Sequence, residues 1–306
     1  MNPGLPRRAS LRKPASVFVS AACAAFLAAP PAAATQTHAP VMQRIHQSGA
    51  IRLAYREDAV PFSYLLDGKP AGYSIDLCLK VVDAVRSALR MPALKVEWVS
   101  VTSMTRFAAM VDGKADLECG TTTNTRQRRE QVAFTIPHFI AGTRMLVRSD
   151  SAIAKWADLR GKTVVSTAGT TSLAMLRALV DTGRIVEARD DGQAFAMIES
   201  GQADAFVMDD VLLASQRTRA RNPADYRITG SMLTVEPYAI MLPPHNDDFK
   251  KLVDKTLTAA INEQETQKLY RRWFQSPVPP LGIALDIAMS NLLRDSFHFP
   301  SDKVAD

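Results

Sequence analysis

Histidine and cysteine are scarce in this 306-residue chain, with five and three copies. No two histidines stand at the spacing of metal ligands, no G-x-S-x-G elbow is present, and no glycine-rich dinucleotide fingerprint follows the first predicted strand. Gly161-Lys162-Thr163 matches the end of a phosphate-binding loop, but Trp156 stands where that motif needs its first glycine. We therefore expect no metal, no cofactor and no enzyme activity.

A strong excess of positive charge is also missing once the N-terminus is set aside. Four of the 37 basic residues and none of the 31 acidic ones lie in residues 1–34, so the rest of the chain carries a formal charge of about +2. Nucleic-acid-binding domains usually present a denser basic face. We expect no nucleic-acid partner.

Long apolar runs are confined to the N-terminal segment, and even there the run is too short to span a bilayer comfortably. A basic start is followed by an apolar stretch over residues 15–29 and by small residues suited to cleavage before Thr35. We expect residues 1–34 to be an export signal and the mature protein to be periplasmic. A lipoprotein-like Cys23 leaves a lipid-anchored form as the less favoured alternative.

Two cysteines, Cys78 and Cys119, remain if Cys23 is removed with the signal. Cys78 falls in a predicted helix and Cys119 at the end of a predicted strand, so the two are candidates for neighbours. An exported protein with two cysteines commonly forms one disulfide. The sequence leaves two alternatives open, a disulfide or two buried thiols.

Strand-like and helix-like segments alternate along the chain in two cycles. Strands separated by helices of about 8 to 15 residues predict βαβ units and mainly parallel sheets. We expect an α/β protein of two lobes with a ligand cleft between them. The predicted strands are 51–55, 95–99, 115–119, 145–147, 163–166, 184–188 and 203–208, and the predicted helices are 75–89, 104–111, 172–180, 193–199, 211–219, 247–263, 265–274 and 283–297.

Polar residues follow the predicted strands, where ligands bind in open α/β sheets. The most informative stretch covers residues 116–130, in which Gly120 allows a turn and three threonines precede Arg128. Hydroxyls and loop carbonyls can bind an ammonium, and a guanidinium can grip a carboxylate through two parallel hydrogen bonds. Taken alone, the stretch is equally consistent with a polar turn before a basic helix.

Short blocks spread over residues 41–305 carry a family resemblance. They are Arg56-Glu57 with Val60-Pro61-Phe62-Ser63-Tyr64, Gly72-Tyr73-Ser74, Thr102-Ser103 with Arg106, Glu118-Cys119-Gly120 with Thr122-Thr123-Asn124, Ala168-Gly169-Thr170-Thr171-Ser172, Met208-Asp209-Asp210 with Leu212-Leu213-Ala214, Lys268 to Trp273, and Pro300 with Asp302-Lys303. With these blocks the chain resembles the periplasmic solute-binding proteins of polar amino-acid ABC importers, and most of all the glutamate/aspartate-binding proteins. The resemblance implies a type II periplasmic binding protein fold with lobe 1 over 41–141 plus 238–306, lobe 2 over 142–237, and hinges near 141–143 and 235–238.

The resemblance also implies which residues hold the backbone part of an amino acid. The α-carboxylate is assigned to Arg128, Thr123, Thr170 and Thr171. The last two stand at a helix start, which favours anions. The α-ammonium is assigned to Asp209 and to the carbonyl or hydroxyl of Thr121. Helix capping is the alternative role for an aspartate here, and we expect it of Asp210 rather than of Asp209.

The ligand side chain is assigned to Arg56, Ser103 and Arg106, which by the resemblance converge on a distal carboxylate. Where the family has Asp-His-Gly, this chain has Asp190-Asp191-Gly192, so Asp191 stands in place of a histidine. A carboxylate close to the carboxylate of a ligand costs up to several kcal/mol in a desolvated site. Three alternatives stay open: Asp191 pairs with Arg56 or Arg106, it points away, or the site prefers a neutral side chain.

We expect glutamate or aspartate as the ligand, with glutamine or asparagine as the alternative. The expected work is capture by a monomer, in which lobe 2 closes over a ligand held by lobe 1 and the closed form docks on a membrane permease. One rival is a dehydratase on the same scaffold, with Glu118 or Asp191 as general acid. The other is the sensor domain of a membrane kinase, for which we find no following membrane or signalling segment.

Overall fold

The structure of the protein, a computed structural model, describes Met1 and residues 40–303. The predicted export signal beyond Met1, Cys23 within it and the last residues of predicted lobe 1 lie outside the described residues. The described residues 40–303 belong to one compact unit. Among the residues that the structure describes, no helix is both long enough and apolar enough to cross a membrane.

The first lobe is built on a five-stranded sheet in the order β5-β1-β6-β14-β7. β1 (Ala50–Tyr55) pairs in parallel with β5 (Lys95–Ser100) and with β6 (Leu117–Glu118), whereas β14 (Met241–Leu242) runs antiparallel to β6 and to β7 (Ala133–Phe134). β2 (Asp58–Ala59), β3 (Ser63–Leu66) and β4 (Lys69–Ala71) form a separate small sheet. The small sheet places residue 58 beside the end of β1.

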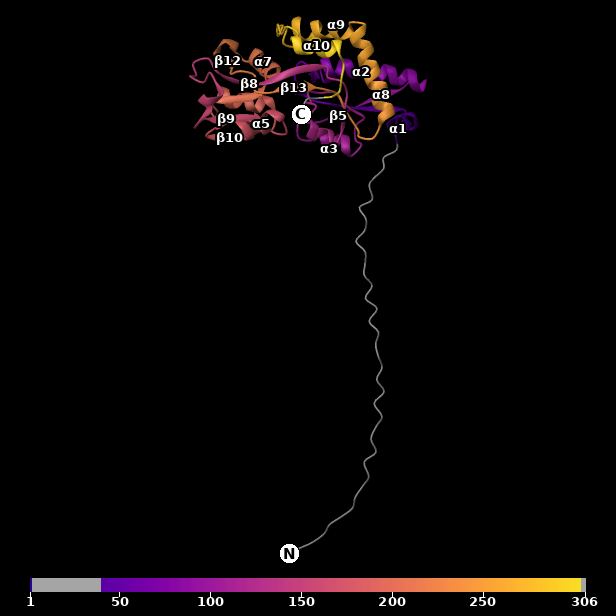
Figure 1. Ribbon diagram of the computed structural model, residues 1–306, viewed down its shortest axis with the longest axis horizontal. Helices are drawn as coiled ribbons and strands as arrows, with labels where there is room; N and C mark the ends of the chain where they lie inside the picture. The colour runs from indigo at the N-terminus through magenta and orange to yellow at the C-terminus, as the bar shows by residue number, and fades with distance from the viewer. Residues whose placement is uncertain (2–39, 304–306) are drawn as a thin grey trace. The chain divides into compact units, whose positions relative to one another are not determined.

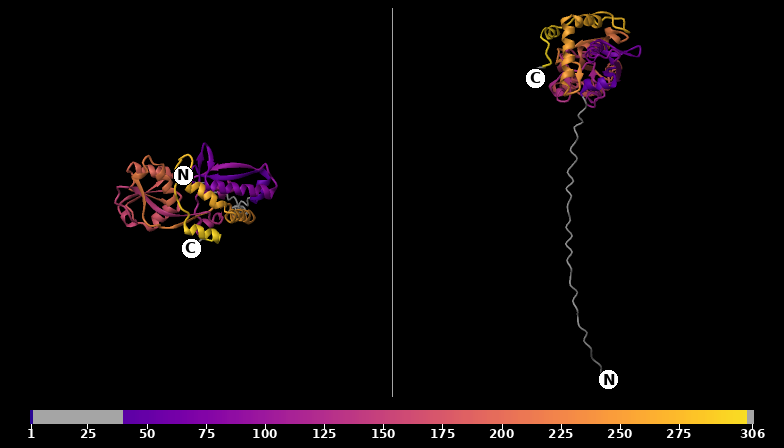
Figure 2. Two further views of the ribbon diagram at one scale, coloured as in Figure 1. Left: turned by 90° about the horizontal axis from the view of Figure 1, so that it is seen from above. Right: turned by 90° about the vertical axis from the view of Figure 1, so that its right-hand side faces the viewer.

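Helices cover this first sheet from distant parts of the chain. α2 (Tyr73–Leu89) packs on β1 and along α8 (Asp247–Asn262), as Figure 2 shows, although the two helices lie far apart in the sequence. The other elements of this lobe are α1 (Val41–Ser48), α3 (Arg106–Val111), α4 (Arg126–Arg129), α9 (Glu265–Tyr270) and the π-helical turn η3 (Arg271–Gln275).

The second lobe has a sheet in the order β10-β9-β11-β8-β12. β9 (Thr163–Thr167) lies in parallel between β10 (Arg184–Ala188) and β11 (Ala205–Asp209), while β8 (Phe139–Arg148) runs antiparallel to β11 and to β12 (Tyr226–Thr229). The predicted α/β alternation is therefore present, and each sheet also has antiparallel strands. The helices are α5 (Thr171–Leu179), α6 (Asp191–Glu199) and α7 (Asp210–Arg219), with short 3₁₀ turns η1 (Trp156–Leu159) and η2 (Pro223–Asp225).

A two-stranded ribbon joins the lobes. The first half of β8 pairs antiparallel with β13 (Val235–Tyr238), and both run between the two lobes in Figure 1. Both predicted hinge segments lie in this ribbon, and their bending stays a prediction. Phe139 and Tyr238, which are paired at one end of the ribbon, are buried against Phe62, and Phe139 also stacks on Phe274. Aromatic contacts of this kind anchor the ribbon in the core of the first lobe.

The predicted helix over residues 283–297 is wrong in its first half. Residues 284–290 have no regular secondary structure, Asp286 among them has a φ of +51°, and α10 covers only Asn291–His298. Leu285, Ile287 and Met289 alternate with other residues and pack against the core, which is a period-2 rather than a helical pattern. Ser290 then caps α10 by accepting a hydrogen bond from the backbone N–H of Leu293.

The cysteine alternatives are decided in favour of a disulfide, since Cys78 of α2 is bonded to Cys119 at the end of β6. Both side chains are fully buried. The bond ties α2 to the start of the loop that carries residues 121–128. It therefore restrains the backbone next to the predicted ligand groups.

The Cys78–Cys119 disulfide should contribute about 2–4 kcal/mol to the free energy of unfolding, because it joins residues 41 positions apart and so restricts the unfolded chain. We expect urea unfolding of the oxidised protein to have a higher midpoint than unfolding in reductant. The double variant Cys78→Ala/Cys119→Ala is the control and should not respond to reductant. Equal midpoints for the oxidised and reduced wild type would contradict this expectation.

Candidate functional site

Polar side chains from both lobes enclose a small cavity at the carboxyl ends of the parallel strands. It is lined by Arg56, Ser103, Arg106, Thr121, Thr123, Thr170, Thr171, Met208 and Asp209. Of the ten predicted site residues, eight line this cavity, while Arg128 and Asp191 lie beside it. The cavity measures about 10 Å³, roughly the space that one water molecule needs. An amino acid can enter only if the walls move apart.

The wall from the first lobe presents unpaired polar atoms to the cavity. Arg106 and Ser103 are each 2% exposed, and the Arg106 Nε and Ser103 Oγ have no hydrogen-bond partner among the described residues. Buried polar groups are normally paired, so unpaired ones at a cavity indicate a place for a ligand. Burial, together with the charge of Arg128, lowers the pKa of Arg106 to about 9. Arg106 is therefore a cation at neutral pH whose charge is poorly compensated.

Arg128 lies at the edge of the cavity in α4, whose N-cap is Thr125. Its Nη1 donates to the carbonyl of Thr123 at 3.0 Å, its Nη2 donates to the carbonyl of Gly169 at 3.3 Å, and its guanidinium lies over the ring of Phe107. Burial lowers its pKa, opposed by the charges of Glu236 and Asp209. Arg128 thus stands beside the cavity and touches both lobes.

The wall from the second lobe begins at the N-terminus of α5. Thr170 is the N-cap and accepts from the N–H of Leu173 at 3.2 Å, and Thr171 donates to the Oε2 of Glu236 at 2.7 Å. The preceding Gly169 has a φ of +76°, and a Cβ there would lie 2.8 Å from the carbonyl oxygen of Ser103. Only glycine fits this close approach between the lobes.

Contacts across the cleft hold the lobes together in this structure. The carbonyl of Gly169 accepts from Arg128 and, at 3.5 Å, from the Nη2 of Arg106, and the hydroxyls of Thr123 and Thr171 lie 3.4 Å apart. Two cationic side chains of the first lobe therefore share one neutral carbonyl of the second. A bound carboxylate would be a stronger acceptor for the same donors.

Asp209 ends β11 at the N-cap position of α7, and its side chain makes no capping hydrogen bond. It accepts from Ser172 Oγ at 2.9 Å, from Thr143 Oγ1 at 3.5 Å and from the Oη of Tyr238. Burial and the charge of Glu236 raise its pKa to about 7. The neighbouring Asp210 is the first residue of α7, and its side chain accepts from the N–H of Val211 and from the N–H of Gly142 in β8. A capping role for Asp210 stays a prediction.

Asp191 is the first residue of α6 and is 1% exposed. Its Oδ1 accepts from Thr167 Oγ1 at 2.5 Å, and its side chain does not line the cavity. Arg56 instead forms an ion pair with Asp58, Nη2 to Oδ1 at 2.9 Å. Asp191 therefore points away from the cavity, because its carboxylate bonds to Thr167. It acts on Arg56 through its charge and forms no ion pair with it.

Sequence reasoning missed several carboxylates around this site. Asp58 binds Arg56, Glu236 accepts from Thr171, and Glu118 is fully buried with its Oε2 accepting from Thr122 at 2.7 Å. Glu118 was considered only as a general acid of a rival enzyme. For Asp58, the short spacing from Arg56 in the sequence was a signal of the ion pair that could have been used. Glu236 comes from a distant strand and had no signal in the local pattern.

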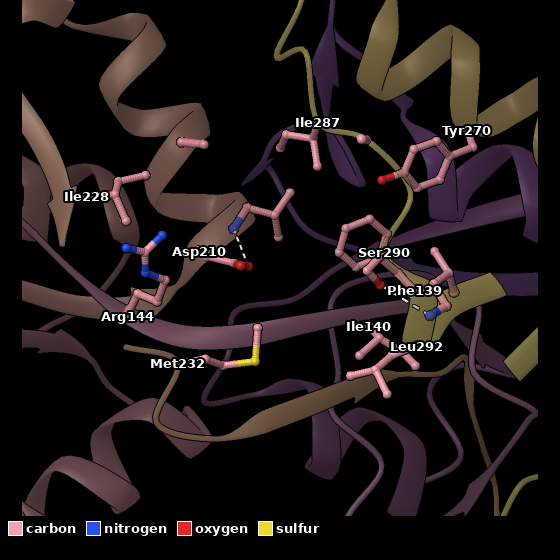
Figure 3. A pocket seen from close by; sticks show the side chains of 14 residues that line it. Phe139, Ile140, Arg144, Asp210, Ile228, Met232, Tyr270, Ile287, Ser290 and Leu292 are labelled. Carbon is pink, nitrogen blue, oxygen red and sulfur yellow. Dashed lines mark hydrogen bonds between the residues drawn. The ribbon is translucent and has the colours of Figure 1, made fainter. Parts of the chain in front are cut away.

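A second pocket of about 260 Å³ lies between the second lobe and the C-terminal segment. Its lining is mostly apolar. Figure 3 shows Ile228 and Met232 of the second lobe and Ile287 and Leu292 of the C-terminal segment in this lining. Its charged groups are already bonded to backbone, since Asp210 accepts from N–H groups and Arg144 donates to the carbonyl of Gly230. It lacks the unpaired cationic donors of the first cavity. Among the described residues, no group of three or more metal-ligating side chains is present either.

The chain is similar to known solute-binding proteins over most of its length. Residues 51–276 match the model of the bacterial extracellular solute-binding proteins, family 3. The chain is 41% identical over 297 residues to the L-glutamate/L-aspartate-binding protein of Pseudomonas aeruginosa, covering 95% of this chain and 98% of that protein. It is 37% identical over 302 residues to the glutamate/aspartate import solute-binding protein of Escherichia coli K12, covering 96% and 98%.

Solved structures share the fold. A mutant of ArgBP from T. maritima matches with a TM-score of 0.69 and 25% identity, covering 77% of this chain and all of that one. An ancestral amino-acid-binding protein, described as a precursor of cyclohexadienyl dehydratase, matches with a TM-score of 0.67 and 26% identity, covering 77% and 99%. The two-lobed α/β architecture is therefore that of amino-acid-binding proteins.

Asp209 should make the folded protein less stable as the pH rises. Its pKa of about 7 lies above the ordinary value near 3.9, so the folded state binds this proton more tightly than the unfolded chain and loses stability between about pH 4 and 7. The variant Asp209→Asn has no acid at this position and should not lose stability in this way. We expect urea unfolding to show the variant gaining stability relative to the wild type between pH 5 and pH 8. A constant difference would show that Asp209 is not held as a buried acid.

Proposed function

Because the chain belongs to the bacterial extracellular solute-binding proteins of family 3, we propose that it captures glutamate or aspartate outside the cytoplasmic membrane and delivers it to the permease of an ABC importer. One observation carries the choice of ligand: three arginines and a buried aspartate surround one cavity between the lobes. Relatives named for glutamate and aspartate match over nearly the whole chain and support it. The protein would act as a monomer in the periplasm, with no nucleic-acid partner.

The backbone of the amino acid would lie between the two lobes. Arg128 and Thr123 would hold the α-carboxylate from the first lobe, and Thr170 and Thr171 from the N-terminus of α5. A bidentate guanidinium and the donors at a helix start both favour a carboxylate. Asp209, assisted by Thr121, would bind the α-ammonium, and this cation would stabilise the ionised form of Asp209, which burial disfavours.

The distal end of the cavity would bind the carboxylate of the side chain. Arg106 and Ser103 line this end and have unpaired buried donors, and Arg56 adds a further guanidinium. A charged donor left unpaired in a buried place is costly, and a carboxylate of the ligand would satisfy it. Glutamine would offer only a neutral carbonyl oxygen to the same groups, so we expect it to bind more weakly.

Closure of the two lobes would depend on the same hydrogen-bond donors. When the lobes separate, Gly169 withdraws its carbonyl from Arg106 and Arg128, and a ligand carboxylate can take its place. The second lobe would then close on the ligand through Thr171 and Asp209, with the bending taken up by the ribbon of β8 and β13. The ligand shifts the equilibrium because it bonds to both lobes only in the closed form.

We infer a binding protein rather than an enzyme. A dehydratase on this scaffold would need a general acid over the substrate, and the two candidates, Glu118 and Asp191, do not line the cavity. Asp209 does line it and is placed to bind an ammonium. The solved neighbour that is named as a precursor of a dehydratase is itself described as an amino-acid-binding protein.

Titration calorimetry with glutamate, aspartate, glutamine and asparagine tests the choice of ligand. We expect tight binding of the two dicarboxylic amino acids and binding of the two amides that is at least about tenfold weaker, since a charge-assisted hydrogen bond is roughly twice as strong as a neutral one. Tight binding of glutamine without a response to glutamate would overturn the proposal.

The neighbouring arginines of α4 offer a matched pair of variants. Arg128 touches both lobes at the cavity, whereas Arg129 donates to the carbonyl of Asp302 in the C-terminal segment. Arg128→Ala should weaken glutamate binding by about 3 kcal/mol or more, roughly a hundredfold. Arg129→Ala should keep the wild-type affinity. Equal losses for the two variants would mean that α4 acts through general charge rather than through one grip.

A further inference from the structure

Arg56 already forms an ion pair with a carboxylate of the protein itself. Its side chain is 4% exposed, and its Nη2 is 2.9 Å from the Oδ1 of Asp58. The other oxygen of that carboxylate, Oδ2, is buried and has no partner among the described residues. Asp58 thus occupies one donor of the guanidinium that the distal carboxylate of a ligand would also need.

Asp191 approaches the same guanidinium from the second lobe. α6 packs against β2, and Asp191 at the start of α6 is close enough to Asp58 and Arg56 for their charges to act on it. Asp191 carries a hydrogen bond from Thr167 and is nearly inaccessible to solvent. The charged groups that act on it are Asp58, Arg56 and, on its own helix cap, Asp190, which is paired with Arg189. Asp58 and Asp191 therefore share the charge of Arg56.

Carboxylates of the protein already offset the guanidinium charge at this end of the cavity before a ligand arrives. The guanidinium groups of Arg56, Arg106 and Arg128 are balanced by three buried or partly exposed carboxylates, Asp58, Asp191 and Glu118. Burial raises the pKa of Glu118, and burial together with Asp58 raises the pKa of Asp191 to about 6. A second carboxylate from a ligand adds one more negative charge in a place with little water, where uncompensated charge is costly.

We propose that Asp191 sets how strongly the site prefers dicarboxylic amino acids as a positioning residue: binding of glutamate or aspartate transfers one proton from solvent to the carboxylate of Asp191, and glutamine binds without it. The added proton forms a carboxylic acid on Asp191 and frees part of the charge of Arg56 for the distal carboxylate. This inference rests on the proposed function and adds the coupling between ligand charge and protonation.

A path for the proton is present. Arg56 and Asp58 line a pocket of about 220 Å³ together with Arg189 and Asp190, beside the cavity and on the border between the lobes. The side chain of Asp58 is 28% exposed. Solvent thus reaches Asp58 and Asp190, which precedes Asp191 in the chain, without passing through the ligand site.

The pH dependence follows from the sign of this step. Below about pH 6 Asp191 already holds the proton, and the glutamate affinity does not depend on uptake. Above that, each pH unit should lower the affinity for glutamate relative to that for glutamine by up to about tenfold. The ratio of the two affinities is the informative quantity, because Asp209 faces the ammonium that both ligands share and its titration cancels.

Calorimetry at pH 7.5 in phosphate and in Tris measures the protons taken up, because the two buffers differ in ionisation enthalpy. For the wild type we expect about one proton more with glutamate than with glutamine. Asp191→Asn should abolish this difference and raise the glutamate affinity about tenfold or more. Asp190→Asn is the matched control: it keeps a side chain that can cap α6 and should retain the wild-type uptake.

Equal proton uptake for glutamate and glutamine in the wild type, or an unchanged difference in Asp191→Asn, would overturn the inference while leaving the proposed function intact. Absence of glutamate and aspartate binding in the wild type would overturn both. If Asp191→Asn does not fold, Asp58→Asn removes the carboxylate that pairs with Arg56 and raises the pKa of Asp191, and it should reduce the extra proton uptake. If glutamine binding is too weak to titrate, the change in glutamate affinity between pH 6 and 8 is compared between the wild type and the variant. The same change in both would overturn the inference.

Discussion

The burial of arginine side chains beside carboxylates in one cleft between the lobes is the constraint on which the site depends. Arg56 and Arg106 are almost inaccessible, yet Arg106 has an unpaired donor and shares a neutral carbonyl with Arg128. Such an arrangement costs free energy in the absence of a ligand. The surrounding scaffold has to hold it, and a carboxylate of a ligand relieves it.

The first lobe holds these side chains in place, and the ribbon of β8 and β13 that joins the lobes is anchored in it. The disulfide from α2 and the aromatic cluster around Phe62 fix the loop after β6 and the base of the ribbon in the first lobe. The second lobe meets the cleft through Gly169 and the N-terminus of α5, where the lack of a Cβ allows backbone to approach backbone. In the proposed closure, the cationic donors would stay in place while the opposite wall moves.

Much of the fold and of the cavity lining could be predicted because both depend on short-range patterns. Alternating strands and helices placed the ends of β1, β5, β6, β9 and β11 where the polar residues follow, and eight of the ten predicted site residues line one cavity. The predicted helix over 283–297 failed because residues 284–290 have a period-2 pattern that was taken for a helical one. β13 and the carboxylate of Glu236 could not be predicted, since a four-residue strand that pairs across the chain carries little local signal.

The sequence by itself determined the chemical set of the site: hydroxyls, guanidinium groups and an aspartate at successive strand ends, which together with the family resemblance indicate an amino acid as the ligand. Only the tertiary structure decided how charge is shared at the distal end. Asp58 and Asp191 come to one guanidinium from different lobes, and Asp191 turns its oxygen to Thr167. Spacing along a chain cannot show which acid neutralises which base, because that depends on distance and burial in the folded protein, and these two quantities set the energy of a charge.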